Sequence, residues 1–134
     1  MKRILLLMVV LLLVSGCNIG QEGQRQTAKK IEAQSVSYQM TSVALYQEYD
    51  ANQVAADQKY KGKVLEVSGP ILRIGKDIMD VPYVILNGDG LSGIQCSFAN
   101  ENEVAKLGNN QQITVHGQCD GMIIDVQLEG CTLK

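Results

Sequence analysis

The sequence predicts a small, mainly β domain that folds as a five-stranded barrel. Strand patterns dominate the chain after Gly62, and one short helix pattern interrupts them. The resulting order of three strands, one helix and two strands is that of the OB-fold, a partly open barrel. A length of 134 residues suits one such domain and is too short for two comfortable cores. A small β-sandwich is the alternative, but it leaves the helix unexplained.

Residues 1–17 have the parts of a bacterial lipoprotein signal. Lys2 and Arg3 precede eleven residues without a polar side chain, residues 4–14, and small residues then lead directly to Cys17. Eleven residues rise only about 16 Å as a helix, roughly half of a bilayer core, so a signal peptide fits better than a permanent span. The segment resembles a lipobox, which implies cleavage after residue 16 and acylation of Cys17. An ordinary signal peptide or a single-pass anchor is the alternative.

The segment between the lipid and the domain is polar. Residues 17–34 are rich in glutamine and almost free of large apolar side chains, which predicts a lipid-anchored flexible tether. The domain itself, residues 35–134, is expected to open with a helical lead-in. Apolar side chains recur every three to four positions between residues 41 and 60, and Thr41 and Asn52 can each cap a helix start. We expect two short helices or one kinked helix there.

Five strand patterns follow the helical lead-in. The first, residues 63–74, contains a Gly69-Pro70 break that suits a bend or bulge in a long strand. The other four are expected at residues 80–87, 91–98, 111–118 and 122–133. Dense turn residues at 87–90 separate the second strand from the third.

Capping and turn residues mark the short helix and the last hairpin. Asn100 is a helix cap, and Glu103 is placed to complete a capping box. Asp120-Gly121 is a strong turn signal between the last two strands. The side chains expected in the core are Ile94, Phe98, Val115, Ile124 and Val126.

Three cysteines remain if Cys17 carries lipid, namely Cys96, Cys119 and Cys131. Disulfides persist in an oxidising envelope, and three thiols allow one bridge. The strands of Cys96 and Cys131 lie beside each other in an OB barrel, so a Cys96–Cys131 disulfide is favoured. Cys119 is expected at the tip of the last hairpin. A Cys119–Cys131 bridge and three free thiols are the alternatives.

Several segments from residue 45 onward form a recognisable set. The longest is NQVAADQKYKGK at residues 52–63, at the entry to the barrel, and the others are residues 67–69, 82–84, 95–98 and 115–121 with Cys131. Together they resemble the tRNA_anti-like family of bacterial lipoproteins. This resemblance implies an OB-fold and a lipoprotein. The family name reflects a structural likeness to anticodon-binding domains, and we do not transfer tRNA binding to this chain.

The charge of the chain disfavours a polyanionic partner. Removing Lys2 and Arg3 from the 12 basic residues leaves ten against 14 acidic ones, a net charge of −4 after cleavage. The basic cluster is Lys59, Lys61 and Lys63, with Tyr60 among them. Such interleaving suits a single-stranded nucleic acid, but it is more typical of a solvated strand edge.

No catalytic or metal-ligating constellation is expected. His116 is the only histidine, it is predicted to face solvent, and no serine or cysteine is arranged with it. A zinc site is disfavoured because no C-x-x-C is present. The loop acids Asp77, Asp80 and Asp89 lack the ligand spacing of an EF-hand. We therefore expect a protein that is not an enzyme and that uses no cofactor and no metal.

Two functions remain open. The first is a lipid-anchored envelope module that binds a glycan, a peptide or another envelope protein on the second and third barrel strands, with Arg73, Lys76 and Tyr83 as the possible ligand face. The alternative is an oligonucleotide-binding OB-fold protein. Asn18 rather than an aspartate follows Cys17. In a cell with two membranes, the resemblance to sorted lipoproteins then implies the periplasmic face of the outer membrane.

Overall fold

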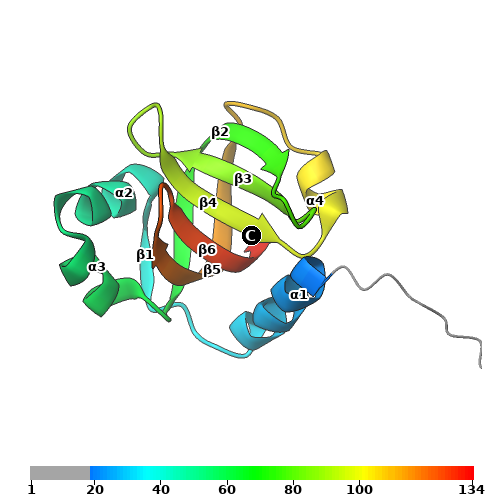
Figure 1. Cartoon of the computed structure of the whole chain (residues 1–134), viewed down its shortest axis with the longest axis horizontal. Coiled ribbons are helices and arrows are strands. Elements are labelled where there is room, and N and C mark those ends of the chain that lie inside the picture. The colour runs from blue at the N-terminus through cyan, green and yellow to red at the C-terminus, as the bar shows by residue number, and fades with distance from the viewer. Residues whose placement is uncertain (1–18) are drawn as a thin grey trace, which may run out of the picture.

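The computed structural model describes residues 19–134, which form an OB-type barrel with one extra strand (Figure 1). The strands are β1 (Tyr38–Thr41), β2 (Val64–Lys76), β3 (Pro82–Asn87), β4 (Gly93–Phe98), β5 (Gln112–Met122) and β6 (Val126–Leu133). The helices are α1 (Ile19–Glu32), α2 (Ser42–Ala51), α3 (Gln53–Tyr60) and α4 (Glu101–Ala105). The sheet order is β1-β2-β3-β4-β6-β5, and β2 also pairs with β5, so the sheet closes into a barrel. The predicted fold class is confirmed; the predicted signal peptide and Cys17 lie outside the described residues.

The long strand β2 bends where the sequence predicts it. Residues 64–70 pair with β5, and the residues from Ile71 onward pair with β3. The change of partner falls directly after Gly69-Pro70. A Cβ atom on Gly69 would lie only 2.9 Å from the Cβ of Ser42, so this position must be glycine for α2 to approach the bend.

Side-chain caps define the two lead-in helices. The side chain of Thr41 accepts a hydrogen bond from the Ala44 amide, and that of Asn52 accepts one from the Ala55 amide. The prediction of two short helices with these caps is therefore confirmed. Buried side chains of α2 and α3, among them Leu45, Tyr49 and Tyr60, pack against the barrel.

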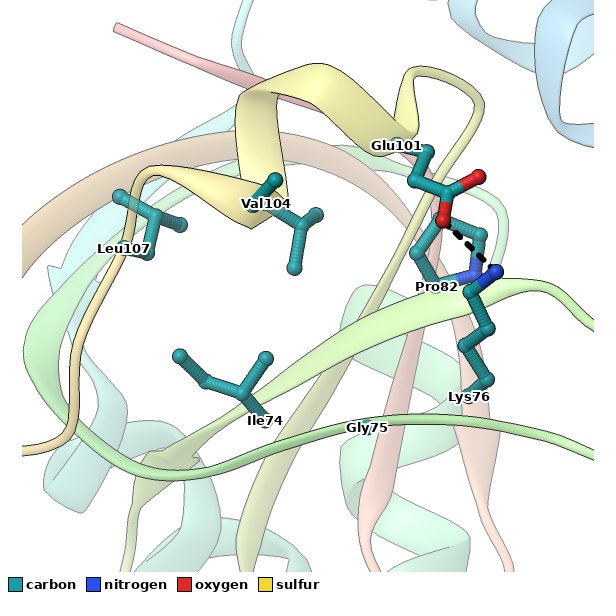
Figure 2. A pocket seen from close by; sticks show the side chains of 8 residues that line it. Ile74, Gly75, Lys76, Pro82, Glu101, Val104 and Leu107 are labelled. Atoms are coloured by element: carbon teal, nitrogen blue, oxygen red, sulfur yellow. Dashed lines mark ion pairs between the residues drawn. The ribbon is translucent and has the colours of Figure 1, made fainter.

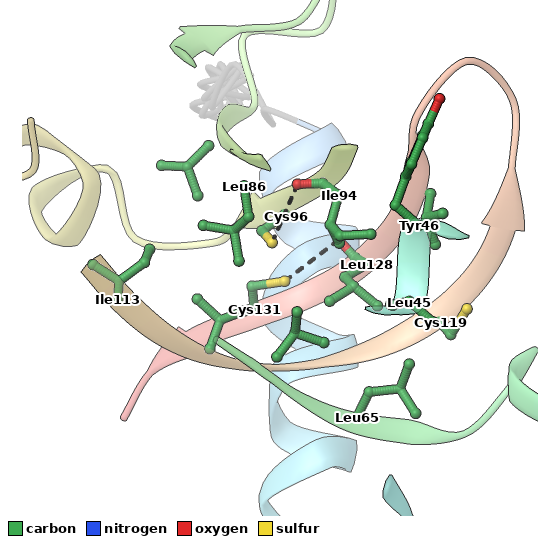
Figure 3. Close-up of a cluster of buried hydrophobic side chains, with 14 of the residues drawn as sticks. Leu45, Tyr46, Leu65, Leu86, Ile94, Cys96, Ile113, Cys119, Leu128 and Cys131 are labelled. Carbon is green, nitrogen blue, oxygen red and sulfur yellow. Dashed lines mark hydrogen bonds between the residues drawn. The ribbon is translucent and has the colours of Figure 1, made fainter. Parts of the chain in front are cut away.

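The core lies inside the barrel (Figure 3). Of the side chains predicted there, four have no more than traces of exposure: Ile94, Phe98, Val115 and Val126. The prediction for Ile124 is wrong, because its side chain is 74% exposed.

The last hairpin turns later than predicted, which explains the exposure of Ile124. β5 continues through Asp120-Gly121 to Met122, so the turn consists of residues 123–125. Gly121 has a φ of +88° and lies at an irregularity in the β5–β6 pairing between Cys119 and Met122. The Asp-Gly pair therefore makes a bulge within the strand instead of its end.

Residues 19–32 form a packed helix where a flexible tether was predicted. α1 lies along β6 (Figure 1), with the side chain of Ile31 buried. The Gln24 side chain donates to the Glu129 carboxylate and accepts from the amide of Gly130. Gly130 has a φ of +61°, and a Cβ atom there would lie 2.6 Å from the backbone nitrogen of Ala28. Because Gly130 has no side chain, α1 can pack closely against β6. The polarity of residues 19–32 does not predict this packing.

The three cysteines in the described residues are free thiols, and all are buried. The favoured Cys96–Cys131 bridge is therefore not formed in the structure, although β4 and β6 lie side by side with Phe98 opposite Cys131. Burial, and next the neighbouring thiol of Cys96, raises the pKa of Cys131 well above its usual value. Cys119 does not lie at the hairpin tip; it faces Leu128 across the β5–β6 ladder because the turn is displaced.

Candidate functional site

An apolar pocket of about 290 Å³ lies where β2 ends, β3 begins and α4 covers the barrel. Figure 2 shows Ile74, Val104 and Leu107 around it, with Lys76 and Glu101 joined across one side. The lining is completed by Gly75, Pro82 and Ala105. Because the lining side chains are mainly aliphatic, the pocket suits an apolar group better than a polar one.

Local sequence positions α4 over this pocket. Asn100 caps the helix by accepting a hydrogen bond from the Asn102 amide, as its place in the sequence predicts. Val104 then faces the barrel and is buried, while Leu107 is partly buried against the same cluster. The helix covers this end of the barrel incompletely, and the remaining space is the pocket.

An ion-pair network neutralises the one basic side chain at the pocket. The Lys76 ammonium lies 2.7 Å from a Glu101 carboxylate oxygen and 3.4 Å from one of Asp80. The hydrogen bond to Glu101 is the largest cause that raises the pKa of Lys76, and Asp80 adds to it. Lys76 is thus a charged but compensated group, and a ligand carrying a phosphate must compete with two carboxylates for it.

The three residues predicted as a ligand face do not share one face of the barrel in the structure. Tyr83 lies opposite Gly75 on the paired strands, and a Cβ atom on Gly75 would be 2.8 Å from the Tyr83 hydroxyl. Arg73 is exposed two positions before Gly75 and so shares its face of β2. Lys76 belongs to the other face, with Ile74, and contributes to the pocket. Only Lys76 of the predicted face therefore lines the pocket.

The pocket residues on α4 and directly after it were not predicted from the sequence. Glu101, Val104 and Leu107 were expected only to build a capped helix, yet they form one wall of the pocket. The sequence did contain one signal for this wall, namely the position of the helix directly after the third barrel strand. A helix at that position covers one end of the barrel.

The predicted basic patch is weaker than its sequence indicates. The Lys59 ammonium lies 3.2 Å from a Glu48 carboxylate oxygen and 4.8 Å from the centre of the Tyr60 ring. Lys61 and Lys63 are exposed at the turn into β2, at the opposite end of that strand from the pocket. One of the three charges is therefore compensated, and none of them faces the pocket.

The other titratable side chains singled out from the sequence have structural contacts. His116 Nε2 lies 2.7 Å from a Glu66 carboxylate oxygen, which also receives Lys134 at 2.6 Å. Asp77 accepts hydrogen bonds from two amides in its own loop, and so does Asp89. Among the described residues no group of three or more histidine, cysteine, aspartate or glutamate side chains is placed to hold a metal ion.

A buried polar pair joins α2 to β5. The Tyr49 hydroxyl is 3.2 Å from Cys119 Sγ, and both side chains have almost no exposed surface. Burial is the main cause that raises the pKa of each group. The Cys119 thiol is therefore held protonated and is a poor nucleophile.

Comparison with known proteins agrees with this architecture. The sequence matches the tRNA_anti-like family over residues 1–132. Its fold is similar to the crystal structure of a "putative nucleic acid-binding lipoprotein" from Klebsiella pneumoniae subsp. pneumoniae MGH 78578, with a TM-score of 0.59 and 25% sequence identity. That similarity covers 73% of this chain and 92% of the other. No curated protein matches the sequence significantly.

Proposed function

Because the chain belongs to the tRNA_anti-like family, we propose that it is a lipid-anchored OB-fold module of the bacterial cell envelope that binds a partner without catalysing a reaction. The observation that carries this proposal is the pocket between β2, β3 and α4. Its apolar lining and its compensated Lys76 favour an apolar side chain of a peptide or an envelope protein. The pocket suits a glycan less well than an apolar side chain. Sugars are bound by many polar groups and by aromatic rings, and the chain has no tryptophan.

The anchor in this proposal is the lipid attached at Cys17. The apolar run and small residues before it support cleavage after residue 16, and the description of the similar Klebsiella protein includes the word lipoprotein. Three acyl chains bind a bilayer stably, whereas one alone binds marginally. In a cell with two membranes, Asn18 directs the protein to the periplasmic face of the outer membrane.

Lipidation is tested by metabolic labelling with a palmitate analogue. The wild-type protein takes up label and its mature form starts at residue 17, whereas Cys17→Ser takes up none. A labelled Cys17→Ser variant contradicts the assignment of the anchor.

Occupation of the pocket is tested by photo-crosslinking in intact cells. A benzoylphenylalanine in place of Ala105, which is exposed and lines the pocket, gives a discrete crosslinked product with the partner. The same residue in place of Asn109, exposed nearby but outside the lining, is the matched control and gives no such product. Identical products at both positions, or none at either, contradict a binding role for the pocket.

Oligonucleotide binding is the second candidate, favoured by the description of the Klebsiella protein. The net charge of −4 after cleavage, the ion pairs of Lys59 and Lys76 and the half-buried Tyr83 oppose it. Non-specific binders reach only about 10⁻⁴–10⁻⁶ M even with a basic surface, so the mature protein is expected to bind more weakly. Fluorescence anisotropy with a labelled single strand at about 0.15 M salt measures this. Micromolar binding that is lost when Lys59, Lys61 and Lys63 become glutamine would favour the second candidate.

A further inference from the structure

The loop between β2 and β3, residues 77–81, carries two adjacent apolar side chains at its tip. Ile78 is fully exposed and the side chain of Met79 is half exposed. Exposed apolar residues are common on protein surfaces, so exposure alone does not identify a contact site, and the position of this loop in the molecule has to be considered as well. We call residues 77–81 the anchor-end loop.

Hydrogen bonds hold the anchor-end loop in this shape. One carboxylate oxygen of Asp77 accepts from the amide of Met79 at 2.8 Å and from that of Val81 at 3.0 Å. The Asp77 amide donates to the Val81 carbonyl, also at 3.0 Å. These bonds fix the backbone of the loop, and the side chain of Ile78 at its tip is fully exposed.

The first turn of α1 packs directly on this loop. A Cβ atom on Gly20 would lie 2.6 Å from Val81 Cγ2 and 3.2 Å from Met79 Cβ. The Gln21 side chain donates to the carbonyl of Asp80 at 3.4 Å. Figure 1 shows this end of α1 at the side of the barrel where α4 lies.

We propose that the anchor-end loop is a membrane-contact site, at which Ile78 and Met79 enter the surface of the lipid bilayer. The inference rests on the proposed acylation of Cys17. Two residues of chain reach at most about 7 Å, so the Cα atom of an acylated Cys17 lies within that distance of Ile19 and its lipid holds the bilayer close to the first turn of α1. Because α1 is docked and not a free tether, the loop beside its first turn is then held against the lipid surface.

The charges around the loop permit this contact. Lys76 forms ion pairs with both Asp80 and Glu101 and so offsets one of their two negative charges, and Arg25 lies 3.6 Å from Glu22. No cluster of unpaired basic side chains is needed, because the acyl chains already supply attachment and the loop has only to orient the domain.

The opposite end of the barrel provides a matched control. Leu91, Ile123 and Ile124 are also strongly exposed, but they lie on the β3–β4 and β5–β6 turns. The Gly93 amide, at the start of β4, donates a hydrogen bond to Asp125 in the β5–β6 turn, so the two turns lie at the same end of the barrel. The six residues of β3 separate them from the anchor-end loop by roughly 17–20 Å.

The absence of tryptophan from the chain allows a single-reporter experiment. Ile78→Trp and Leu91→Trp are prepared in the full-length lipoprotein and reconstituted into vesicles of phosphatidylethanolamine and phosphatidylglycerol, with and without brominated acyl chains. The indole emission of the Ile78→Trp protein is expected to shift to shorter wavelength on the vesicles and to be quenched by brominated lipid. The emission of the Leu91→Trp protein is expected to show neither change.

Each other outcome counts against the inference in a distinguishable way. Equal quenching of both variants, or quenching of neither while the protein stays on the vesicles, overturns the membrane-contact site and leaves the proposed anchor intact. A wild-type protein that does not sediment with the vesicles, and that carries no acyl group by mass spectrometry, overturns the proposed anchor and the inference with it.

Discussion

At the scale of the residue, Phe98 tests the barrel core. Its ring is fully buried in β4, and Phe98→Ala leaves a cavity that the surrounding strands cannot close. We expect a loss of about 3–5 kcal/mol in the free energy of unfolding, measured by urea denaturation. Ile124→Ala is the control, because this side chain is exposed at the hairpin turn, and it should change stability by no more than about 0.5 kcal/mol. Similar losses for both variants would contradict the assigned core.

Protonation of Glu66 makes the free energy of unfolding depend on pH in the acid range. A hydrogen bond from Lys134, and next one from His116, holds the pKa of Glu66 below its ordinary value of 4.5. The folded state thus favours the carboxylate, so the contribution of Glu66 is present above that ordinary pKa and is lost as the pH falls through the lowered one. Glu66→Gln should therefore show a shallower loss of stability on acidification, measured as urea midpoints from neutral pH down to about pH 3. Parallel curves for the two proteins would contradict the ion-pair network.

At the scale of the element, the docking of α1 depends on Gly130. A side chain there meets the backbone of Ala28 and needs a φ of +61°, so Gly130→Ala should release α1 from β6. Hydrogen exchange of residues 19–32 should rise towards that of an isolated helix, while the barrel strands stay protected.

Gly23→Ala is the matched control for this experiment. A Cβ atom on Gly23 contacts nothing within 4 Å, and alanine favours a helix by about 1 kcal/mol over glycine. Protection of α1 should stay the same or increase. Loss of protection in Gly23→Ala, or full protection in Gly130→Ala, would show that Gly130 is not the determinant of docking.

Local signals explain which elements could be predicted. The caps at Thr41, Asn52 and Asn100 act through neighbouring amides, so the sequence alone locates the helices they start. β1 has only four residues and exists because it pairs in parallel with β2, across a connection that contains two helices. α1 likewise needs β6 to pack against. Neither partner is visible in the local pattern of the segment.

Of the residues predicted as a ligand face, Lys76 lines the pocket, but the sequence did not predict the pocket itself. Lys76 and Tyr83 flank the loop after the first barrel strand, where OB-folds place ligand contacts. The register of β2 against β3 shifts between Ile71 and Arg73, and simple alternation cannot anticipate such a shift. The pocket arises only when α4 closes on the ends of β2 and β3, which is a tertiary event.

At the scale of the whole molecule, the three buried thiols report on global unfolding. Cys96, Cys119 and Cys131 lie on β4, β5 and β6, and none is exposed by more than 1%. With Cys17 blocked by the acylation that we propose, the native protein should resist maleimide, and the three buried thiols should react together when urea unfolds the barrel without a reductant. Mass spectrometry counts the adducts. One reactive thiol instead of three would show that a disulfide forms after all, and peptide mapping would then identify the pair.

The clasp between α1 and β6 joins residues that are 105 and 106 positions apart, almost the full length of the described chain. Contacts of such separation form late, because the intervening chain must first be ordered. β6 is also the last strand to be synthesised and the one that lies between β4 and β5. In the export that we propose, residues 19–32 therefore have no surface to dock on until the C-terminal end has crossed the membrane and completed the barrel. Until then, residues 19–32 are a free connection to the rest of the chain. Folding of the barrel shortens this connection, because it allows the segment to dock as α1.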